Sequence, residues 1–366
     1  MAKRWVIAGG GTGGHVTPAL ALGEAVVERG DEVLFIGSER GLESKLVPDA
    51  GFDLEVLPSE QVMGRSLFGR IRGAFSILRS VGRARRLLKN FEADAVVSVG
   101  GYAAMPAALA AWTRGIPLFL VEPNAIPGRV NRLTARLART VFVGFESTRG
   151  HLPEKTESLC LGVPLRRALY QAFAKREAAK VPSTPLHVFV FGGSQGARQL
   201  NEHVPEALSR LAKGSVEVFH QTGEKDRAEV SARYEELDIK AETVAFERNM
   251  PDRYAWADLV ICRAGALTVA ELALAGAPAL LVPYPFAADN HQAANARALE
   301  DGGAAKQIPA NPLDVHALAQ AVAESVTTPG RLLLMREAAV RLARPRAAAD
   351  IIEHALTRLE TKQGGA

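Results

Sequence analysis

Two stretches of this chain share one pattern: a short apolar run, a cluster of glycines and then a helical pattern. In the first, residues 4–8 are followed by GGGTGG at 9–14 and a helical pattern at 18–29. In the second, residues 187–191 are followed by GGSQG at 192–196 and another helical pattern. A strand, a glycine loop and a helix form the usual start of a doubly wound α/β domain. The repetition therefore predicts two Rossmann-like parallel-sheet domains.

Further apolar runs supply the remaining strands of each half. We expect strands at 33–37, 94–99, 117–121 and 140–143, and in the second half at 216–221, 241–246, 258–262 and 278–283. We place an N-terminal domain at 1–163, a C-terminal domain at 164–340 and a helical tail at 341–366, expected to pack back on the N-terminal domain. Ligands of such sheets bind at the carboxyl ends of the strands.

Composition excludes several classes of protein. The 366 residues are 48% hydrophobic and 23% charged, enough for two globular cores, and the net charge of +4 favours anionic partners. The two cysteines, Cys160 and Cys262, give neither a disulfide framework nor a zinc site. The N-terminus lacks an export signal, and the most apolar run, 264–286, contains a glutamate and four helix breakers. We therefore expect a soluble protein without a metal.

Three glycine clusters follow predicted strands, at 9–14, 100–101 and 192–196. Backbone N–H groups at a helix start suit a phosphate. A single cluster can be a tight turn that needs small residues. Three clusters across two domains favour more than one phosphorylated ligand, such as a diphosphate donor and a second phosphorylated substrate.

The first cluster differs from the dinucleotide-binding pattern. No acidic residue ends the second strand, where Gly37 and Ser38 stand, and Glu39 is a weak substitute. This disfavours an NAD dehydrogenase. His15 directly follows the glycines and can exchange a proton near neutral pH, although a histidine in this position can also cap or pack at the helix start.

A second candidate site lies between residues 262 and 295. After the strand at 258–262, a helix opens with Gly265 and Thr268, and Glu271 follows one turn later. The helix start suits a phosphate and the carboxylate suits sugar hydroxyls. The alternative, a surface ion pair between Arg263 and Glu271 with glycines that only assist packing, is equally compatible with this stretch.

Residues 61–91 form a basic amphipathic segment without any Asp or Glu. Such a segment can lie on an anionic membrane, or be a helix with a core face and a basic solvated face. Nucleic acid is disfavoured because the basic residues are not interleaved with exposed aromatic ones.

Eight blocks occur in order: GGGTGGHVTPALAL, GGY, EPNAIPGRVNRL, GVPLR, GGSQGARQLN, HQTG, YAWADLVICRAGALTVAEL and DNHQAANA. Together they resemble the MurG family, UDP-N-acetylglucosamine-dependent transferases of glycosyltransferase family 28. The resemblance implies a GT-B fold and inverting transfer of GlcNAc from UDP-GlcNAc to the C4 hydroxyl of MurNAc in lipid I (undecaprenyl-diphosphate-MurNAc-pentapeptide). It also implies that no cofactor is needed and that the protein lies peripherally on the cytoplasmic face of the anionic inner membrane, where other cell-wall synthesis proteins can be partners.

The resemblance also implies the site residues. Those carried over as donor contacts are Thr12, Gly13, Gly14, Asn124, Arg166, Ser194, Glu247, Ala266, Leu267, Thr268, Glu271 and Gln292. Those matching acceptor or cleft positions are Gly100, Gly101, Tyr102 and Asn201. For the catalytic base we choose His15, with Glu122 as its rival or as the group that orients its imidazole.

Two positions depart from the family pattern. Val121 stands where the family commonly has a histidine before Glu122, so that histidine cannot be the base here. Position 247 is often apolar in the family, which leaves Glu247 a backbone contact to uracil. Two other functions stay open: a nonhydrolysing UDP-GlcNAc 2-epimerase, and a nucleotide-sugar-binding subunit that recruits an enzyme to the membrane.

Overall fold

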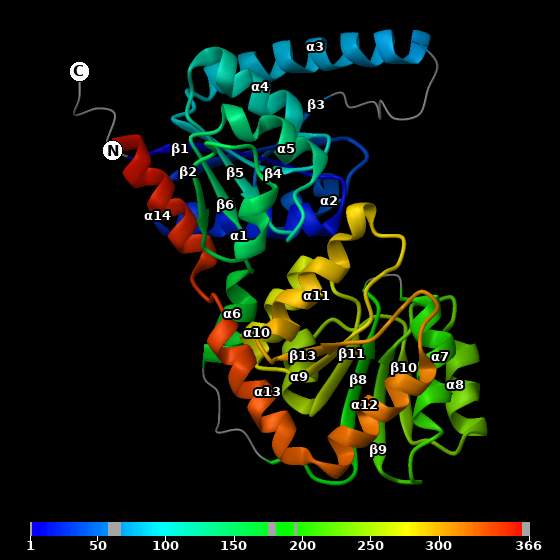
Figure 1. Cartoon of the computed structure of the whole chain (residues 1–366). Coiled ribbons are helices and arrows are strands. Elements are labelled where there is room, and N and C mark those ends of the chain that lie inside the picture. The colour runs from blue at the N-terminus through cyan, green and yellow to red at the C-terminus, as the bar shows by residue number, and fades with distance from the viewer. Residues whose placement is uncertain (1, 58–66, 175–180, 194–195, 361–366) are drawn as a thin grey trace. The chain divides into compact units, whose positions relative to one another are not determined.

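The protein divides into two compact units, each built on one parallel sheet. The computed structural model describes residues 2–57, 67–174, 181–193 and 196–360 (Figure 1). Unit 1 comprises Met1–Arg167 and Pro345–Ala366, and unit 2 comprises Ala168–Arg344. The predicted fold class, two Rossmann-like sheets as in GT-B proteins, is confirmed.

The sheet of unit 1 has seven strands in the order β3-β2-β1-β4-β5-β6-β7. Its strands are β1 (Arg4–Gly9), β2 (Glu32–Ser38), β3 (Leu54–Leu57), β4 (Ala95–Gly100), β5 (Leu118–Glu122), β6 (Thr140–Val143) and β7 (Ser158–Cys160). Its helices are α1 (Gly13–Glu28), α2 (Glu43–Asp49), α3 (Leu67–Asn90), α4 (Ala104–Arg114), α5 (Arg129–Thr134) and α14 (Ala347–Glu360), with 3-10 turns η1 (Ala135–Leu137) and η2 (Glu146–His151).

Both faces of this sheet are covered, which explains its continuous apolar strands. Trp5 and Ile7 of β1 pack with residues of α1 and α14, whereas Val6 and Ala8 pack with residues of α3 and α4. In α14, Ile351, Ile352 and Ala355 are buried in the same cluster as the core residues of α1. The last helix of the chain therefore completes the core of the first unit.

The sheet of unit 2 has six strands in the order β10-β9-β8-β11-β12-β13. They are β8 (Leu186–Phe191), β9 (Val216–Gln221), β10 (Ala241–Val244), β11 (Leu259–Cys262), β12 (Ala279–Leu281) and β13 (Ala305–Gln307). The helices are α6 (Arg167–Ala174), α7 (Arg198–Leu208), α8 (Arg227–Glu236), α9 (Met250–Trp256), α10 (Ala266–Ala275), α11 (His291–Asp301), α12 (Val315–Thr327) and α13 (Pro329–Leu342), with the 3-10 turn η3 (Ala288–Asn290).

The strand order reverses at one point in each sheet. In unit 1 the reversal lies between the neighbours β1 and β4, and in unit 2 between β8 and β11. In open α/β sheets, the loops that follow the strands on either side of such a reversal diverge and leave room for a ligand. Among the described residues, the loops that follow these strands are residues 9–14, 100–101 and 192–193 and the turn before α10.

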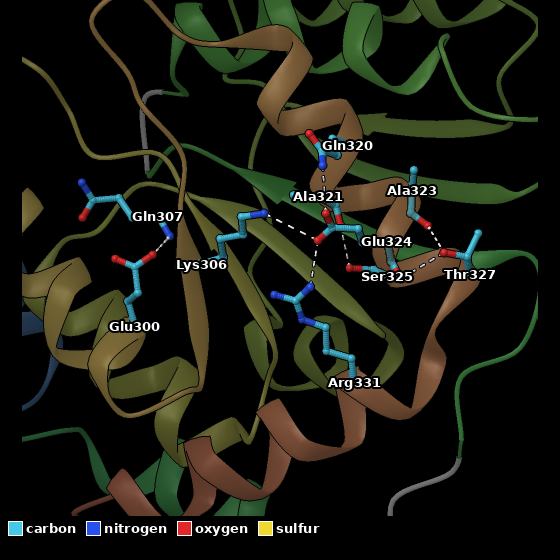
Figure 2. Close-up of polar contacts among 10 residues, drawn as sticks. All are labelled: Glu300, Lys306, Gln307, Gln320, Ala321, Ala323, Glu324, Ser325, Thr327 and Arg331. Carbon is cyan, nitrogen blue, oxygen red and sulfur yellow. Dashed lines mark hydrogen bonds and ion pairs between the residues drawn. The ribbon is translucent and has the colours of Figure 1, made fainter.

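An ion cluster joins β13, α12 and α13 on the surface of unit 2. Glu324 of α12 accepts a hydrogen bond from Gln320 at 3.1 Å and pairs with Lys306 Nζ at 3.6 Å and Arg331 Nη1 at 2.8 Å (Figure 2). The charge of Lys306 and the bonds from Arg331 and Gln320 lower the pKa of Glu324. Because all three charged side chains remain partly exposed, the cluster is expected to add little stability.

We expect His220 to make the stability of unit 2 depend on pH. Its side chain on β9 is fully buried, with Nδ1 3.0 Å from the Tyr234 hydroxyl, and burial lowers its pKa to about 3. Between pH 6.5 and 3, the unfolded chain binds a proton that the folded chain rejects, so stability falls as pH falls. We expect a loss of about 2 kcal/mol in unfolding free energy between pH 7 and pH 5. In denaturant titrations, His220→Leu/Tyr234→Phe should remove this part of the pH dependence; an unchanged slope would contradict the assignment.

Candidate functional site

The first glycine loop leaves the start of α1 open. Thr12 is the N-cap and makes no side-chain capping bond. Its carbonyl accepts from the N–H groups of His15 and Val16, both at 3.1 Å. For Gly13 and Gly14, no backbone carbonyl partner occurs among the described residues. These amides, with the positive end of the helix dipole, can bind an anion.

The second glycine loop lies directly against the first. Gly100 and Gly101 both have positive φ, at 96° and 84°. A Cβ on Gly101 would lie 2.3 Å from the carbonyl oxygen of Gly10, so a side chain is excluded by contact as well as by conformation. The structure thus brings together two clusters that the sequence only places after separate strands. Tyr102, next in the chain, is 47% exposed.

His15 is held at the start of α1 by its neighbour. Its Nδ1 lies 3.1 Å from Thr12 Oγ1, and its side chain is partly exposed. When Nδ1 carries the proton and donates it to Thr12, Nε2 is the basic nitrogen. This geometry is compatible with the proton transfer expected of His15.

Glu122 organises the loop that follows β5. The residue is 1% exposed. One carboxylate oxygen accepts from the Asn124 N–H at 2.9 Å, and the other from Gly128 N–H and Asn131 Nδ2, both at 2.9 Å. Burial raises the pKa of Glu122 although these bonds oppose it. Both oxygens therefore act on the loop that carries Asn124.

In unit 2, Glu271 points to a tyrosine and not to Arg263. Tyr254 donates its hydroxyl hydrogen to Glu271 Oε2 at 2.9 Å, and burial raises the pKa of Glu271 to about 7. Arg263 Nη1 donates to Gln199 Oε1 and to the carbonyls of Val282 and Pro283. The alternative of an Arg263–Glu271 ion pair is therefore wrong.

The start of α10 resembles the start of α1. Gly265 is the N-cap of α10 and, as a glycine, has no side chain that could cap the helix. The first N–H groups of the helix are those of Ala266, Leu267 and Thr268. Glu271 follows about one turn later on the same helix. The arrangement suits a phosphate at the helix end and hydroxyl groups beside it.

Gln292 has a fixed amide orientation. Its Oε1 accepts from the N–H groups of Tyr284 at 2.9 Å and Ala264 at 3.3 Å. Because both partners are donors, the oxygen must face them and the NH2 group must face away. That NH2 group can donate to a sugar hydroxyl.

The side chain of Glu247 shapes its own loop. It accepts from Asn249 N–H at 2.6 Å and from Arg253 Nε at 2.8 Å. Partial burial opposes ionisation, but these bonds outweigh it and lower the pKa of Glu247. The side chain is thus committed within the protein, which fits the expectation of a backbone contact at this position.

The three remaining predicted residues are Asn201, Arg166 and Ser194, and each has a different environment. Asn201 is buried and donates to Thr222 O at 2.9 Å and Asp226 Oδ2 at 2.8 Å, so it supports the loop after β9. Arg166 forms an ion pair with Glu24 of α1 within unit 1, and its Nε donates to Glu24 Oε1 at 2.8 Å. Ser194 lies outside the described residues.

Comparison with known proteins identifies the family. The glycosyltransferase family 28 N-terminal domain matches residues 5–143, and the family 28 C-terminal domain matches residues 187–353. A Geobacter sulfurreducens protein is 42% identical over 352 residues, covering 95% of this chain and 96% of its own; it is named UDP-N-acetylglucosamine–N-acetylmuramyl-(pentapeptide) pyrophosphoryl-undecaprenol N-acetylglucosamine transferase. This chain belongs to the MurG family of glycosyltransferases.

One solved structure supports the MurG assignment, and another shares only the fold. Acinetobacter baumannii MurG has a TM-score of 0.81 at 32% identity, covering 97% of this chain and 99% of that one. A UDP-GlcNAc 2-epimerase from Neisseria meningitidis has a TM-score of 0.68 at 12% identity, covering 97% and 100%. At that identity the second likeness shows the shared fold alone.

The sequence analysis does not predict two residues that contact the candidate site. Glu43 of α2 is buried beneath the first glycine loop and bonds Gly11 N–H, and Tyr254 of α9 bonds Glu271. Tyr254 is the first residue of the block YAWADLVICRAGALTVAEL, and its presence in a block that resembles the family could have indicated a role at the site. Glu43 follows the second strand by five residues, where a search confined to the strand end overlooks it.

Over residues 2–57, 67–174, 181–193 and 196–360, no group of three or more His, Cys, Asp or Glu side chains is placed to hold a metal ion.

Proposed function

We propose that this protein transfers GlcNAc from UDP-GlcNAc to the C4 hydroxyl of MurNAc in lipid I, releasing UDP and forming lipid II with inversion at the sugar carbon. The observation that carries this proposal is the near full-length similarity to a curated transferase of that name, at 42% identity. The open helix starts in both units support it, because donor and acceptor both carry a diphosphate.

The donor site is proposed mainly in unit 2. The amides of Ala266, Leu267 and Thr268 would bind phosphate oxygens, and Glu271 would accept from ribose hydroxyls. Gln292 would donate to a sugar hydroxyl, and the backbone at Glu247 would contact uracil. The family resemblance adds, as further contacts to the diphosphate or sugar, Thr12, Gly13, Gly14, Asn124, Arg166 and Ser194.

The acceptor site is proposed at the paired glycine loops of unit 1. Gly100 and Gly101 touch the first loop, and Tyr102 beside them is exposed enough to contact a ligand. The family resemblance makes Asn201 a cleft residue. Its side chain, in unit 2, bonds Thr222 O and Asp226 Oδ2, which supports a role in positioning the loop after β9.

In the proposed reaction, the C4 hydroxyl oxygen attacks the anomeric carbon of GlcNAc while the bond from that carbon to the UDP oxygen breaks. His15 takes the hydroxyl proton, and the electron pair of the broken bond leaves with UDP. Helix-start amides stabilise the charge that develops on the diphosphate. Glu122 contributes by holding the Asn124 loop, since both of its oxygens are bonded there.

The acceptor lipid implies action at a membrane surface. No helix among the described residues is long and apolar enough to cross a membrane. On α3, Ala84 and Leu88 are buried against the sheet while five basic residues are exposed: Arg79, Arg83, Arg85, Arg86 and Lys89. We propose that this basic face binds the anionic cytoplasmic surface of the inner membrane. Other cell-wall synthesis proteins at that surface are proposed as further partners.

The test of this function is UDP release from UDP-GlcNAc, with and without a short-chain lipid I analogue. The transferase predicts release that depends on the analogue. Conversion of UDP-GlcNAc to UDP-ManNAc without acceptor would indicate the epimerase instead. Donor binding with neither reaction would indicate a recruiting subunit.

A further inference from the structure

A buried carboxylate lies beneath the first glycine loop and is not used by the proposed reaction. Glu43, the first residue of α2, is 1% exposed. Its Oε2 accepts from Gly11 N–H at 2.7 Å, and its Oε1 accepts from Ser38 N–H at 2.8 Å and Ser38 Oγ at 2.6 Å. One side chain therefore joins the loop after β1 to the end of β2.

Three glycines leave the space that this carboxylate fills. A Cβ on Gly10 would lie 2.2 Å from Glu43 Oε1, and one on Gly41 would lie 2.0 Å from Glu43 Oε2. A Cβ on Gly37 would lie 2.5 Å from Glu43 Cγ. Real Cβ atoms do not approach other atoms this closely, so these positions are small because Glu43 occupies the space. Neither Gly10, Gly37 nor Gly41 has a positive φ that would give a separate reason for glycine.

The bond to Gly11 decides which amides of the loop are available. Because Gly11 N–H is turned inward to Glu43, it is not available to a ligand, whereas no backbone carbonyl partner occurs among the described residues for the amides of Gly13 and Gly14 at the start of α1. The same loop supplies the Gly10 carbonyl that touches Gly101. Glu43 thus sets the position of both glycine loops of unit 1.

The placement of this acid also bears on the class of ligand. In dinucleotide-binding domains, an acid at the end of the second strand accepts from a ribose hydroxyl. Here Ser38 ends β2, Glu39 is exposed, and the buried acid nearby already has three donors. Glu43 therefore has no room for a ribose, which favours a phosphorylated ligand without a nucleoside at this loop.

We propose that Glu43 is a positioning residue that holds the glycine loops of unit 1 ready for the diphosphate of the lipid acceptor. This inference rests on the proposed function for the identity of the acceptor. A loop fixed before binding loses less conformational freedom on binding. Removing the Glu43 bond is therefore expected to weaken use of the acceptor much more than binding of UDP, because the contacts proposed for the nucleoside and for the phosphates at the start of α10 lie in unit 2.

The first variant is Glu43→Gln, which keeps the shape of the side chain. Its NH2 group must face either Gly11 N–H or the Ser38 donors, so at least one bond becomes a donor–donor contact. We expect kcat/KM for a lipid I analogue to fall by about tenfold or more, with the Kd for UDP within twofold of wild type. Amide hydrogen exchange over residues 9–16 should become faster. Glu39→Gln, an exposed glutamate four residues away, is the matched control and should change none of these quantities.

A second variant, Gly41→Ala, displaces the carboxylate without altering the glycine loops themselves. It should reproduce the defect of Glu43→Gln, and the double variant should be no worse than either single one. The proposal is overturned if Glu43→Gln or Gly41→Ala keeps acceptor kcat/KM within twofold of wild type. It is also overturned if UDP affinity and Tm fall in parallel with activity, because Glu43 would then only stabilise the fold. If the wild-type protein shows no acceptor-dependent turnover, the proposed transferase function is refuted instead. The rate of amide hydrogen exchange over residues 9–16 in Glu43→Gln would still decide whether Glu43 holds the loop.

Discussion

Replacing His15 by alanine is expected to lower kcat by about 10²- to 10⁴-fold, the usual contribution of a general base. The imidazole lies at the start of α1, next to the open amides of Gly13 and Gly14, and Thr12 orients its Nδ1 at 3.1 Å. UDP affinity should change little, because the helix start and carboxylate proposed for the nucleotide belong to unit 2.

The measurement is steady-state turnover with a lipid I analogue across pH 6 to 9. His151→Ala is the matched control, since His151 is an exposed histidine of η2 in the same unit. Thr12→Val, which removes the partner of Nδ1, should give a smaller loss than His15→Ala. If His15→Ala retains kcat within a few-fold of wild type, His15 is not the base.

The second large effect concerns Glu271. Glu271→Ala is expected to weaken UDP-GlcNAc binding by about 10- to 100-fold, because hydrogen bonds to a charged group contribute about 1.5–3 kcal/mol. Its pKa of about 7 adds a pH dependence. The ionised form accepts hydroxyl hydrogens, so donor affinity should rise between pH 6 and pH 8 and level off above it.

Tyr254→Phe tests the pH dependence separately. The tyrosine hydroxyl bonds Glu271 and favours its ionised form, so removing that hydroxyl should raise the pKa of Glu271 further. The midpoint of the affinity rise should move to higher pH, while affinity at the highest pH is nearly retained. Calorimetric titration of UDP-GlcNAc at several pH values measures both quantities, with Glu235→Ala on α8 as an exposed control. A Glu271→Ala variant with wild-type affinity at every pH would exclude Glu271 from the donor site.

The sequence predicts the two-sheet architecture because parallel strands buried on both faces are read as continuous apolar runs. It does not reveal β3, β7 and β13, which are only three or four residues long and partly exposed. The helical tail is expected to begin at residue 341, but in the structure α13 continues to Leu342 in unit 2, and α14, in unit 1, begins at Ala347.

At the candidate site, the sequence predicts which loops contain the candidate binding residues, but it does not predict which hydrogen bonds their side chains form. The glycine clusters are visible as motifs, yet their contact through Gly10 and Gly101 depends on the neighbouring positions of β1 and β4. Glu122 has the residue type of a base, and only its hydrogen bonds to Asn124, Gly128 and Asn131 show that both oxygens are in use. Glu43 has no motif of its own, because its partners are backbone amides of other segments.

The most direct test of the proposed transfer is the structure of its product. The protein would be incubated with UDP-GlcNAc and a short-chain lipid I analogue, and the product examined by mass spectrometry and NMR. The account predicts one GlcNAc added in β-linkage to the C4 hydroxyl of MurNAc, together with an equal amount of UDP, because the sugar is α-linked in the donor and is inverted on transfer. An α-linked product, attachment elsewhere, or an unchanged acceptor with UDP-ManNAc formed would contradict it.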